Sequence, residues 1–321
     1  MKRDTNLPLP TAPTFVWTLV GIDQRNQGEM LLLSASSAHL FHPEAKKVCL
    51  VPAEEAPVTR ERLASLNAFG CHLDVIGIDV PRLSDLHRSR WLKIQAYAFL
   101  QQSCLFLDTD TLFVGSFDFA AVRSGRVGAC ENRDGDRGRP FSSEDWVRKK
   151  FVACGWEWST TPSLAYLNSG VILFEASSQA SDFVSLWFEN WNHAVRCTGE
   201  HLDQPAFNHT ARTLNTCCLL PPSWNVPVSA LPQLARSAHL FHYYSSTQTG
   251  KAPHTLWGWL IEQMQRGALD PRTLQEILKR RKPFVGLGAT AAEYWCSGQW
   301  HYYAITRFIS LLRLCMRGKS V

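Results

Sequence analysis

The clearest chemical signal in this sequence is a pair of aspartates separated by one residue, Asp108 and Asp110. They follow Cys104–Leu107, a short apolar run that predicts a buried strand of a sheet covered on both faces. Open α/β sheets place their ligands at the carboxyl ends of such strands. If the chain turns between them, both carboxylates can share one hard cation, which can hold a diphosphate and neutralise its charge on departure. The alternative is a strand that ends in two solvated aspartates.

The elements that must position these aspartates alternate between strand and helix. The expected strands are Phe15–Gly21, Lys47–Val51, His72–Ile78 and Cys104–Leu107. The expected helices between them are Gln27–Leu40, Val58–Ala68 and Ser89–Gln101. This alternation predicts a parallel sheet of Rossmann-like build. Neither Gly-x-Gly-x-x-Gly nor a P-loop pattern follows the first strand, which argues against NAD-binding and P-loop proteins.

The pattern changes after Asp110. Residues 132–162 are polar and without clear periodicity, which is typical of a functional loop or a short helical insertion. Gly170 lies inside an expected strand, where glycine often marks a bulge or a close approach of ligand. The strands expected in this half are Arg126–Glu131, Tyr166–Glu175 and His239–Tyr244. The expected helices are Phe183–Ala194, Asp203–Arg212, Thr255–Arg266 and Pro271–Arg281.

The composition is that of a globular protein with a substantial core, because 45% of the 321 residues are hydrophobic and 19% are charged. No apolar run approaches the roughly 20 residues of a membrane span. Met1–Pro13 is polar and lacks an apolar signal-peptide core, so we expect no Sec export and a cytoplasmic location. The ten cysteines form no Cys-x-x-Cys pair, which argues against zinc and thioredoxin-type sites and favours reduced thiols.

The C-terminal segment is strongly basic. Residues 271–321 carry nine Lys and Arg and two acids, a net charge of +7 in a chain whose total is +5. Five apolar residues of this segment fall on one face of a helix: Ile305, Phe308, Ile309, Leu312 and Met316. A basic helix with such a face can lie on an anionic membrane or pack on the domain, and both interpretations stay open. Nucleic acid is not an expected partner, because the charge is not joined to a recognised binding motif.

Taken in order, these segments resemble the retaining GT-A-fold glycosyltransferases that include glycogenin and the bacterial galactosyltransferases of lipooligosaccharide synthesis. The resemblance spans residues 16–251. Asp108 and Asp110 match the metal-binding Asp-x-Asp of that family. His242 matches the histidine that completes its metal site, and His239 is a rival for that place.

The resemblance also implies where the donor is bound. Asp203 and Gln204 match a pair beside the reacting anomeric carbon, and Lys93 matches a phosphate-binding lysine. Arg25 stands where family members often carry a tyrosine that stacks on uracil, so a nucleotide diphosphate is better supported than UDP itself. The donor-binding residues implied in this way are Leu19, Gly21, Asp23, Lys93, Asp108, Thr109, Asn168, Ser169 and Lys251.

As a whole, the resemblance implies a GT-A α/β fold over residues 14–265 and a basic helical extension over residues 266–321. The implied activity is metal-dependent transfer of a hexose from a nucleotide-diphosphate sugar, a UDP-sugar in much of the family, to a glycan or glycolipid acceptor with retention. Mn²⁺ is favoured over Mg²⁺ because imidazole suits transition metals.

Two other functions are weighed against this one. Asp-x-Asp after an apolar strand is also found at the start of the domain in phosphatases of the haloacid-dehalogenase type. Those enzymes place Thr or Val where this chain has Leu112, and three strand–helix units precede the motif here. A non-catalytic sugar-nucleotide-binding module is the other alternative. At single positions, Lys93 can be a solvated helix residue, and Asp203 can be an ordinary first-turn aspartate favoured by the helix dipole.

Overall fold

The computed structural model describes residues 12–24, 26–64, 69–121, 127–132, 145–158, 165–228, 231–243 and 255–317. Its strands are β1 (Thr14–Thr18), β2 (Lys47–Pro52), β3 (Asp74–Ile78), β4 (Cys104–Leu107), β5 (Thr111–Phe113), β6 (Val127–Glu131), β7 (Leu167–Phe174), β8 (Cys217–Leu219), β9 (Val226–Pro227) and β10 (Leu240–His242). Its helices are α1 (Gln27–Phe41), α2 (Ala56–Leu63), α3 (Asp85–Leu100), α4 (Asp145–Ala153), α5 (Ser178–Thr198), α6 (Gln204–Leu214), α8 (Leu256–Gln265), α9 (Pro271–Lys279), α10 (Ala291–Cys296) and α11 (Trp300–Arg317).

The larger sheet has seven strands in the order β3-β2-β1-β4-β7-β6-β8. The first four are parallel neighbours, whereas β7 runs antiparallel to both β4 and β6. The predicted α/β class with a Rossmann-like parallel sheet is therefore confirmed. Because β7 runs in the opposite direction, its first residues lie at the same edge as the last residues of β4.

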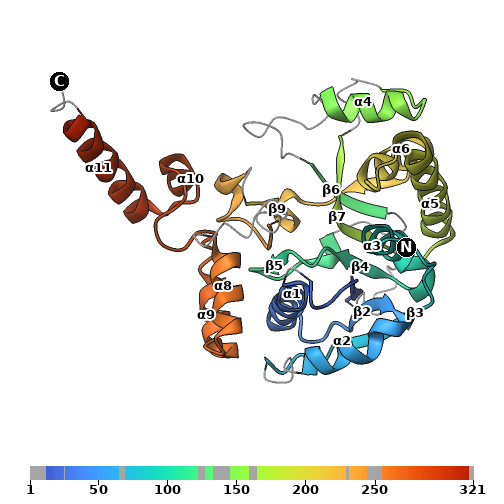
Figure 1. Ribbon diagram of the computed structural model, residues 1–321, viewed down its shortest axis with the longest axis horizontal. Helices are drawn as coiled ribbons and strands as arrows, with labels where there is room; N and C mark the ends of the chain where they lie inside the picture. Colours follow the sequence, from blue (N-terminus) through green and yellow to red (C-terminus); the bar gives the residue numbers. More distant parts are fainter. Residues whose placement is uncertain are drawn as a thin grey trace, which may run out of the picture.

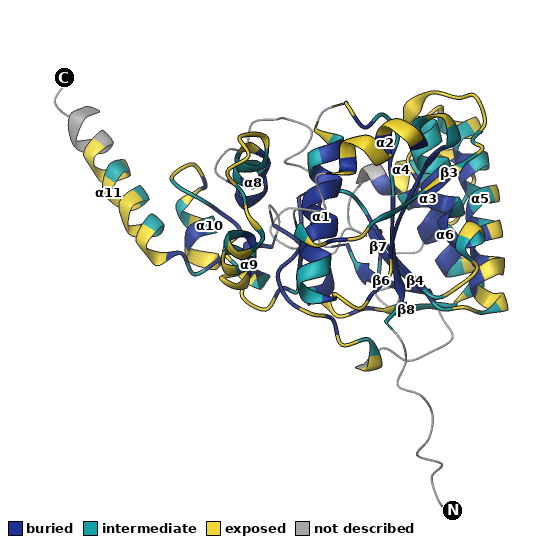
Figure 2. Ribbon diagram, turned by 90° about the horizontal axis from the view of Figure 1, so that it is seen from below, coloured by how far each residue is buried: buried dark blue, intermediate teal, exposed yellow. Residues whose placement is uncertain are grey.

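Helices cover both faces of this sheet, which gives three layers (Figure 1). Successive side chains of a strand point to opposite faces. Accordingly Phe15 and Trp17 of β1 pack with side chains of α1 and α2, and Val16 packs with side chains of α3, α5 and α6. The strands are buried throughout most of the sheet (Figure 2), so their ends are rigid supports for a site.

A second sheet, in the order β5-β10-β9, lies beside the first. Its apolar side chains join a third buried cluster, which contains Met30 of α1, Leu112 of β5, Leu260 of α8 and Leu274 of α9. Residues on both sides of position 265 therefore share one core. The division of the chain there stays a prediction.

The last helix, α11, extends away from the body (Figures 1 and 2). Its apolar residues Ile305, Phe308, Leu311 and Leu312 are exposed. In the described part of the chain, no helix is long and apolar enough to cross a membrane.

Most predicted elements are present, with different ends. Helix α3 begins at Asp85 instead of Ser89, because Ser84 caps it by accepting a bond from the His87 backbone N–H. Helix α5 begins at Ser178 instead of Phe183, after a similar cap from Ser177. Strand β1 ends at Thr18, so the predicted strand was three residues too long at its carboxyl end. The last residues of the helix predicted to end at position 68 lie outside the described residues.

Candidate functional site

The site forms where β4 and the start of β7 lie side by side. Leu107, the last residue of β4, is the register partner of Val171. The pairing continues one step further, since the Asp108 backbone N–H donates to the Gly170 carbonyl at 2.8 Å. The antiparallel course of β7 thus brings the segment that begins at Asn168 against the Asp-x-Asp motif.

The chain turns between the two aspartates and enters β5. The Thr111 hydroxyl closes this turn by donating to the Asp108 carbonyl at 2.8 Å. Strand β5 pairs with β10 so that Thr111 lies opposite His242, and the Tyr243 N–H donates to the Asp110 carbonyl at 3.0 Å. The smaller sheet therefore positions the histidine against both aspartates.

His242, Asp108 and Asp110 form one group of potential ligands. His242 Nε2 lies 3.2 Å from Asp110 Oδ1 and 4.0 Å from Asp108 Oδ2. One ligand atom from each of the three residues lies within 4.8 Å of the others. Two carboxylates and one imidazole are a donor set that fits a divalent transition metal or Mg²⁺. The Asp-x-Asp segment is thus turned as a shared cation requires.

Gly170 makes this convergence sterically possible. A Cβ atom at this position would lie 2.4 Å from Cε1 of His242 and 2.8 Å from Oδ2 of Asp108. Those distances are shorter than van der Waals contact, so any larger residue would push the three groups apart. The sequence predicted a close approach at this glycine, and its neighbours turn out to be the candidate metal ligands themselves.

The orientation of His242 is set by Asn225. The amide group of Asn225 donates to Asn168 Oδ1 at 2.9 Å, and that oxygen also accepts the Gly170 N–H at 2.8 Å. Asn225 must therefore present its own oxygen to His242 Nδ1, at 2.9 Å. A hydrogen bond from Nδ1 fixes the tautomer, and the other ring nitrogen faces the carboxylates.

The ionisation of His242 and Asp110 follows from their contact. Burial alone would lower the pKa of His242, but the Asp110 and Asp108 carboxylates raise it. Burial alone would raise the pKa of Asp110, but His242 and then Lys93 lower it. Contact with His242 thus holds Asp110 as a carboxylate in the folded site.

A second charged group lies on the other side of Asp108, where α3 meets the start of α6. Lys93 Nζ lies 3.2 Å from Asp108 Oδ1 and 3.0 Å from Asp203 Oδ2. The Lys93 side chain is 3% exposed, and Arg90 approaches Asp203 from the preceding turn of α3 at 3.3 Å. The solvated-helix interpretation of Lys93 is therefore wrong.

Asp203 is buried and ionised. It stands at the N-cap of α6, but its side chain caps nothing, so the helix-dipole interpretation does not describe its contacts. Burial would raise the pKa of Asp203, but Lys93, Arg90 and a hydrogen bond from Ser169 lower it to about 2. Its neighbour Gln204 accepts the Ser169 backbone N–H at 3.2 Å. Both predicted residues at the start of α6 are thereby tied to the start of β7.

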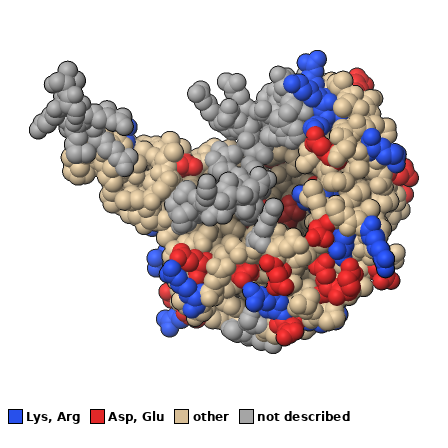
Figure 3. All heavy atoms as spheres, viewed as in Figure 1, with Lys and Arg blue, Asp and Glu red and all other residues tan. Residues whose placement is uncertain are grey.

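A pocket of about 520 Å³ opens beside these charges. Its size is typical of a small-molecule site. Figure 3 shows a hollow on one face of the molecule, with acidic atoms in its depth. The pocket joins the carboxyl end of β1 to α3 and the Asp-x-Asp turn, and it is lined by Thr18, Leu19, Val20, Gln24, Gln27, Met30, Asp85, Leu86, Ser89, Arg90, Lys93, Asp108, Thr109 and Asp110.

The predicted donor residues divide into four sets. Four line this pocket: Leu19, Lys93, Asp108 and Thr109. Asn168 and Ser169 lie behind the aspartates and bond to Asn225 and Asp203. Gly21 and Asp23 are not among the lining residues; Gly21 has φ +70° in the turn after β1, and its N–H donates to Glu55 at 2.7 Å. Lys251 and Arg25 lie outside the described residues.

The rival histidine, His239, lies elsewhere. Its ring is 6.2 Å from the ring of Phe117, and it is not part of the Asp108–Asp110–His242 group. Burial and the nearby Arg281 both lower the pKa of His239. The geometry favours His242 as the ligand.

Three residues of the site were not predicted. Arg90 precedes Lys93 by three residues and shares its helix face, a spacing that could have revealed it. Gln27 accepts a hydrogen bond from the Thr109 hydroxyl at 3.3 Å. The only hint in the sequence is its position as the first residue of α1. Asn225 follows a turn-rich segment, and no sequence signal connects it to His242.

No family model and no curated protein matches this sequence. Among solved structures, mouse xyloside xylosyltransferase 1 in its apo form is similar with a TM-score of 0.47 and 13% identity, over 73% of this chain and 98% of that one. The glycosyltransferase GlyE from Streptococcus pneumoniae TIGR4 is similar with a TM-score of 0.49 and 12% identity, over 87% of this chain and 66% of that one. Likeness at this level does not identify a family for the chain.

Proposed function

We propose that this chain is a metal-dependent glycosyltransferase of the GT-A fold. In this proposal it transfers a hexose, with retention, from a nucleotide-diphosphate sugar to a glycan or glycolipid acceptor. The observation that carries the proposal is the convergence of Asp108, Asp110 and His242 beside a pocket that Lys93 also lines. The order of these motifs along the chain, which resembles that family, supports it independently.

The donor set suits Mn²⁺ or Mg²⁺, and the imidazole favours Mn²⁺. Asp108, Asp110 and His242 would hold the ion, which when bound neutralises the charge of a departing nucleotide diphosphate. Lys93 lines the same pocket and adds a fixed positive charge there. A preorganised charge of this kind stabilises a leaving group without reorganisation during the reaction.

Asp203 is poorly suited to accept a proton. Its pKa of about 2 makes it a weak base at neutral pH, and its oxygens already face Lys93, Arg90 and Ser169. An inverting enzyme needs a general base for the incoming hydroxyl. Asp203 is not suited to be that base, which supports a retaining reaction. In the proposed reaction Asp203 acts through Lys93, and Gln204 and Asn168 act near the donor sugar.

The direct test is release of nucleotide from a panel of nucleotide-diphosphate sugars, with and without Mn²⁺. We expect metal-dependent release by the native chain and its loss in Asp108→Ala and Asp110→Ala. Asp79→Ala is the matched control, because Asp79 follows β3 of the same sheet but is exposed and outside the pocket. Native release rates in folded Asp108 and Asp110 variants would overturn the proposal. Metal-dependent binding without release would favour the non-catalytic module.

A further inference from the structure

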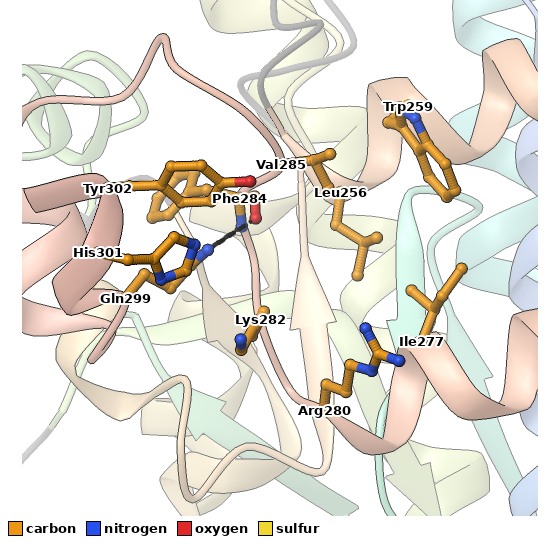
Figure 4. Close-up of a pocket in the computed structure, with 10 residues that line it drawn as sticks. All are labelled: Leu256, Trp259, Ile277, Arg280, Lys282, Phe284, Val285, Gln299, His301 and Tyr302. Carbon is orange, nitrogen blue, oxygen red and sulfur yellow. Dashed lines mark hydrogen bonds between the residues drawn. The ribbon is translucent and has the colours of Figure 1, made fainter. Parts of the chain in front are cut away.

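A second pocket, of about 380 Å³, lies among the helices that follow residue 255, and it shares no lining residue with the donor pocket (Figure 4). It opens between α8, α9 and the start of α11. Its lining residues are Leu256, Trp259, Ile277, Arg280, Lys282, Phe284, Val285, Gln299, His301 and Tyr302.

The shape of this pocket is fixed by buried hydrogen bonds. The Gln299 amide donates to the Phe284 carbonyl at 2.8 Å and accepts the Phe284 N–H at 3.3 Å. Gln299 is only 1% exposed, so this clamp is protected from water. The Leu256 N–H donates to the Pro283 carbonyl at 2.8 Å, which ties α8 to the same segment. The apolar wall between α8 and this segment is thus preformed.

The charge around the pocket has one sign. Arg280, Lys282 and His301 contribute basic side chains, and no carboxylate is among the lining residues (Figure 4). Each acid in the described part of residues 266–317 is engaged elsewhere: Asp270 with Thr273, Glu276 with Arg272, and Glu293 with Thr290. In the part of the chain that the structure describes, no carboxylate pairs with Arg280 or Lys282.

We propose that this pocket binds an amphiphile with a phosphate head group. The guanidinium of Arg280 suits phosphate oxygens, and Lys282 and His301 add donors on the same rim. The apolar part of the ligand packs on Trp259, Ile277 and Val285, which are partly exposed in the pocket. Inorganic phosphate would leave the apolar wall exposed to water, and a neutral amphiphile would leave the basic groups without a counter-charge. A ligand with both a phosphate and an apolar part satisfies both sides of the pocket.

The test is calorimetric titration of the full chain, without added metal, with hexyl phosphate, inorganic phosphate and the neutral tetraethylene glycol monohexyl ether. We expect hexyl phosphate to bind about tenfold more tightly than either of the others. Arg280→Gln/Lys282→Gln should remove that advantage. The control Lys279→Gln/Arg307→Gln removes the same charge from exposed positions outside the pocket and should leave the affinity unchanged.

Three outcomes would overturn the proposal. Equal affinity for hexyl phosphate and inorganic phosphate would reduce the pocket to an anion site. An equal loss in the control double variant would assign binding to net charge. Loss of hexyl phosphate binding in a folded Lys93→Gln variant would place the ligand in the donor pocket, because Lys93 lines that pocket.

Discussion

Replacement of Asp203 by asparagine tests whether the charged group beside the Asp-x-Asp motif stabilises the fold. Asparagine keeps the size of the side chain and an oxygen for the Ser169 hydroxyl, but it removes the charge that faces Lys93 and Arg90. Asp203 is 5% exposed, so water screens this charge little. We therefore expect a measurable loss of stability from an isosteric change.

The magnitude follows from the structure. At an effective dielectric constant of about 20, charges separated by the 3.0 Å between Lys93 Nζ and Asp203 Oδ2 attract by about 5 kcal/mol. Desolvation of the carboxylate offsets much of this gain. A fall in pKa from 3.8 to about 2 corresponds to a net stabilisation of about 2 kcal/mol.

This stabilisation has a defined pH dependence. Because the folded-state pKa of Asp203 is depressed, the contribution is fully present above pH 3.8 and is lost as pH falls towards 2. At pH 3 about half of it remains. Urea unfolding should therefore show that Asp203→Asn is less stable than the native chain by about 2 kcal/mol at pH 7. At pH 3 the difference should be about 1 kcal/mol.

The control is Asp182→Asn, because Asp182 is an exposed aspartate on α5. Its effect on the free energy of unfolding should be close to zero at both pH values. If the Asp203 variant and the native chain differ by the same amount at pH 7 and pH 3, the carboxylate is not held ionised by Lys93 and Arg90. The electrostatic explanation would then be wrong, whatever the size of the difference.

The remaining predictions concern the site. Gly170→Ala should weaken Mn²⁺ binding by about tenfold or more, because the new methyl group would overlap the ring of His242. His242→Ala should raise the Mn²⁺ requirement of nucleotide release much more than His239→Ala does. Asn225→Leu removes the hydrogen bond to Nδ1 and should raise the same requirement by about 10- to 100-fold without replacing a ligand. Gln204→Ala should lower turnover more than donor affinity, and NMR of the product from an α-linked donor should show an α-linkage.

Each of these has an outcome that would contradict it. Unchanged Mn²⁺ affinity in a folded Gly170→Ala variant would show that the three groups need not converge. A stronger effect at His239 would move the ligand there, and an unaffected Asn225→Leu variant would remove its positioning role. A β-linked product from an α-linked donor would reject retention, regardless of how the Gln204 variant behaves.

The sequence predicts the backbone of the fold well, because strand and helix periodicities are local. Cys104–Leu107 is a buried strand as predicted, since four apolar residues between polar ones leave few alternatives. Strand β5 was missed because its three residues follow the Asp-x-Asp turn too closely to show a pattern. Helix α10 was missed for the same reason of length, although Thr290 and Glu293 form a capping box.

The residues of the site are easier to predict from the sequence than the contacts between their side chains. Lys93 and Asp203 were identified by resemblance, but they are far apart in the sequence and meet only because α3 and the start of α6 converge on β7. Asn225 is harder still, since its function depends on two side chains from different strands. A local pattern can propose a ligand, whereas the residue that orients the ligand becomes visible only in the folded chain.

The distribution of charge in the site bears on the order in which ligands bind. Asp203 is already compensated by Lys93 and Arg90, so this group can stay in place whether or not a ligand is present. Among the residues that the structure describes, Asp108 and Asp110 are paired with His242 and Lys93, and Lys93 is shared with Asp203. A diphosphate that enters the pocket would meet these carboxylates at close range, and like charges there cost several kcal/mol. In the proposed reaction we therefore expect the cation to bind before the donor or together with it, because the paired side chains that the structure describes here leave the two carboxylates only partly neutralised.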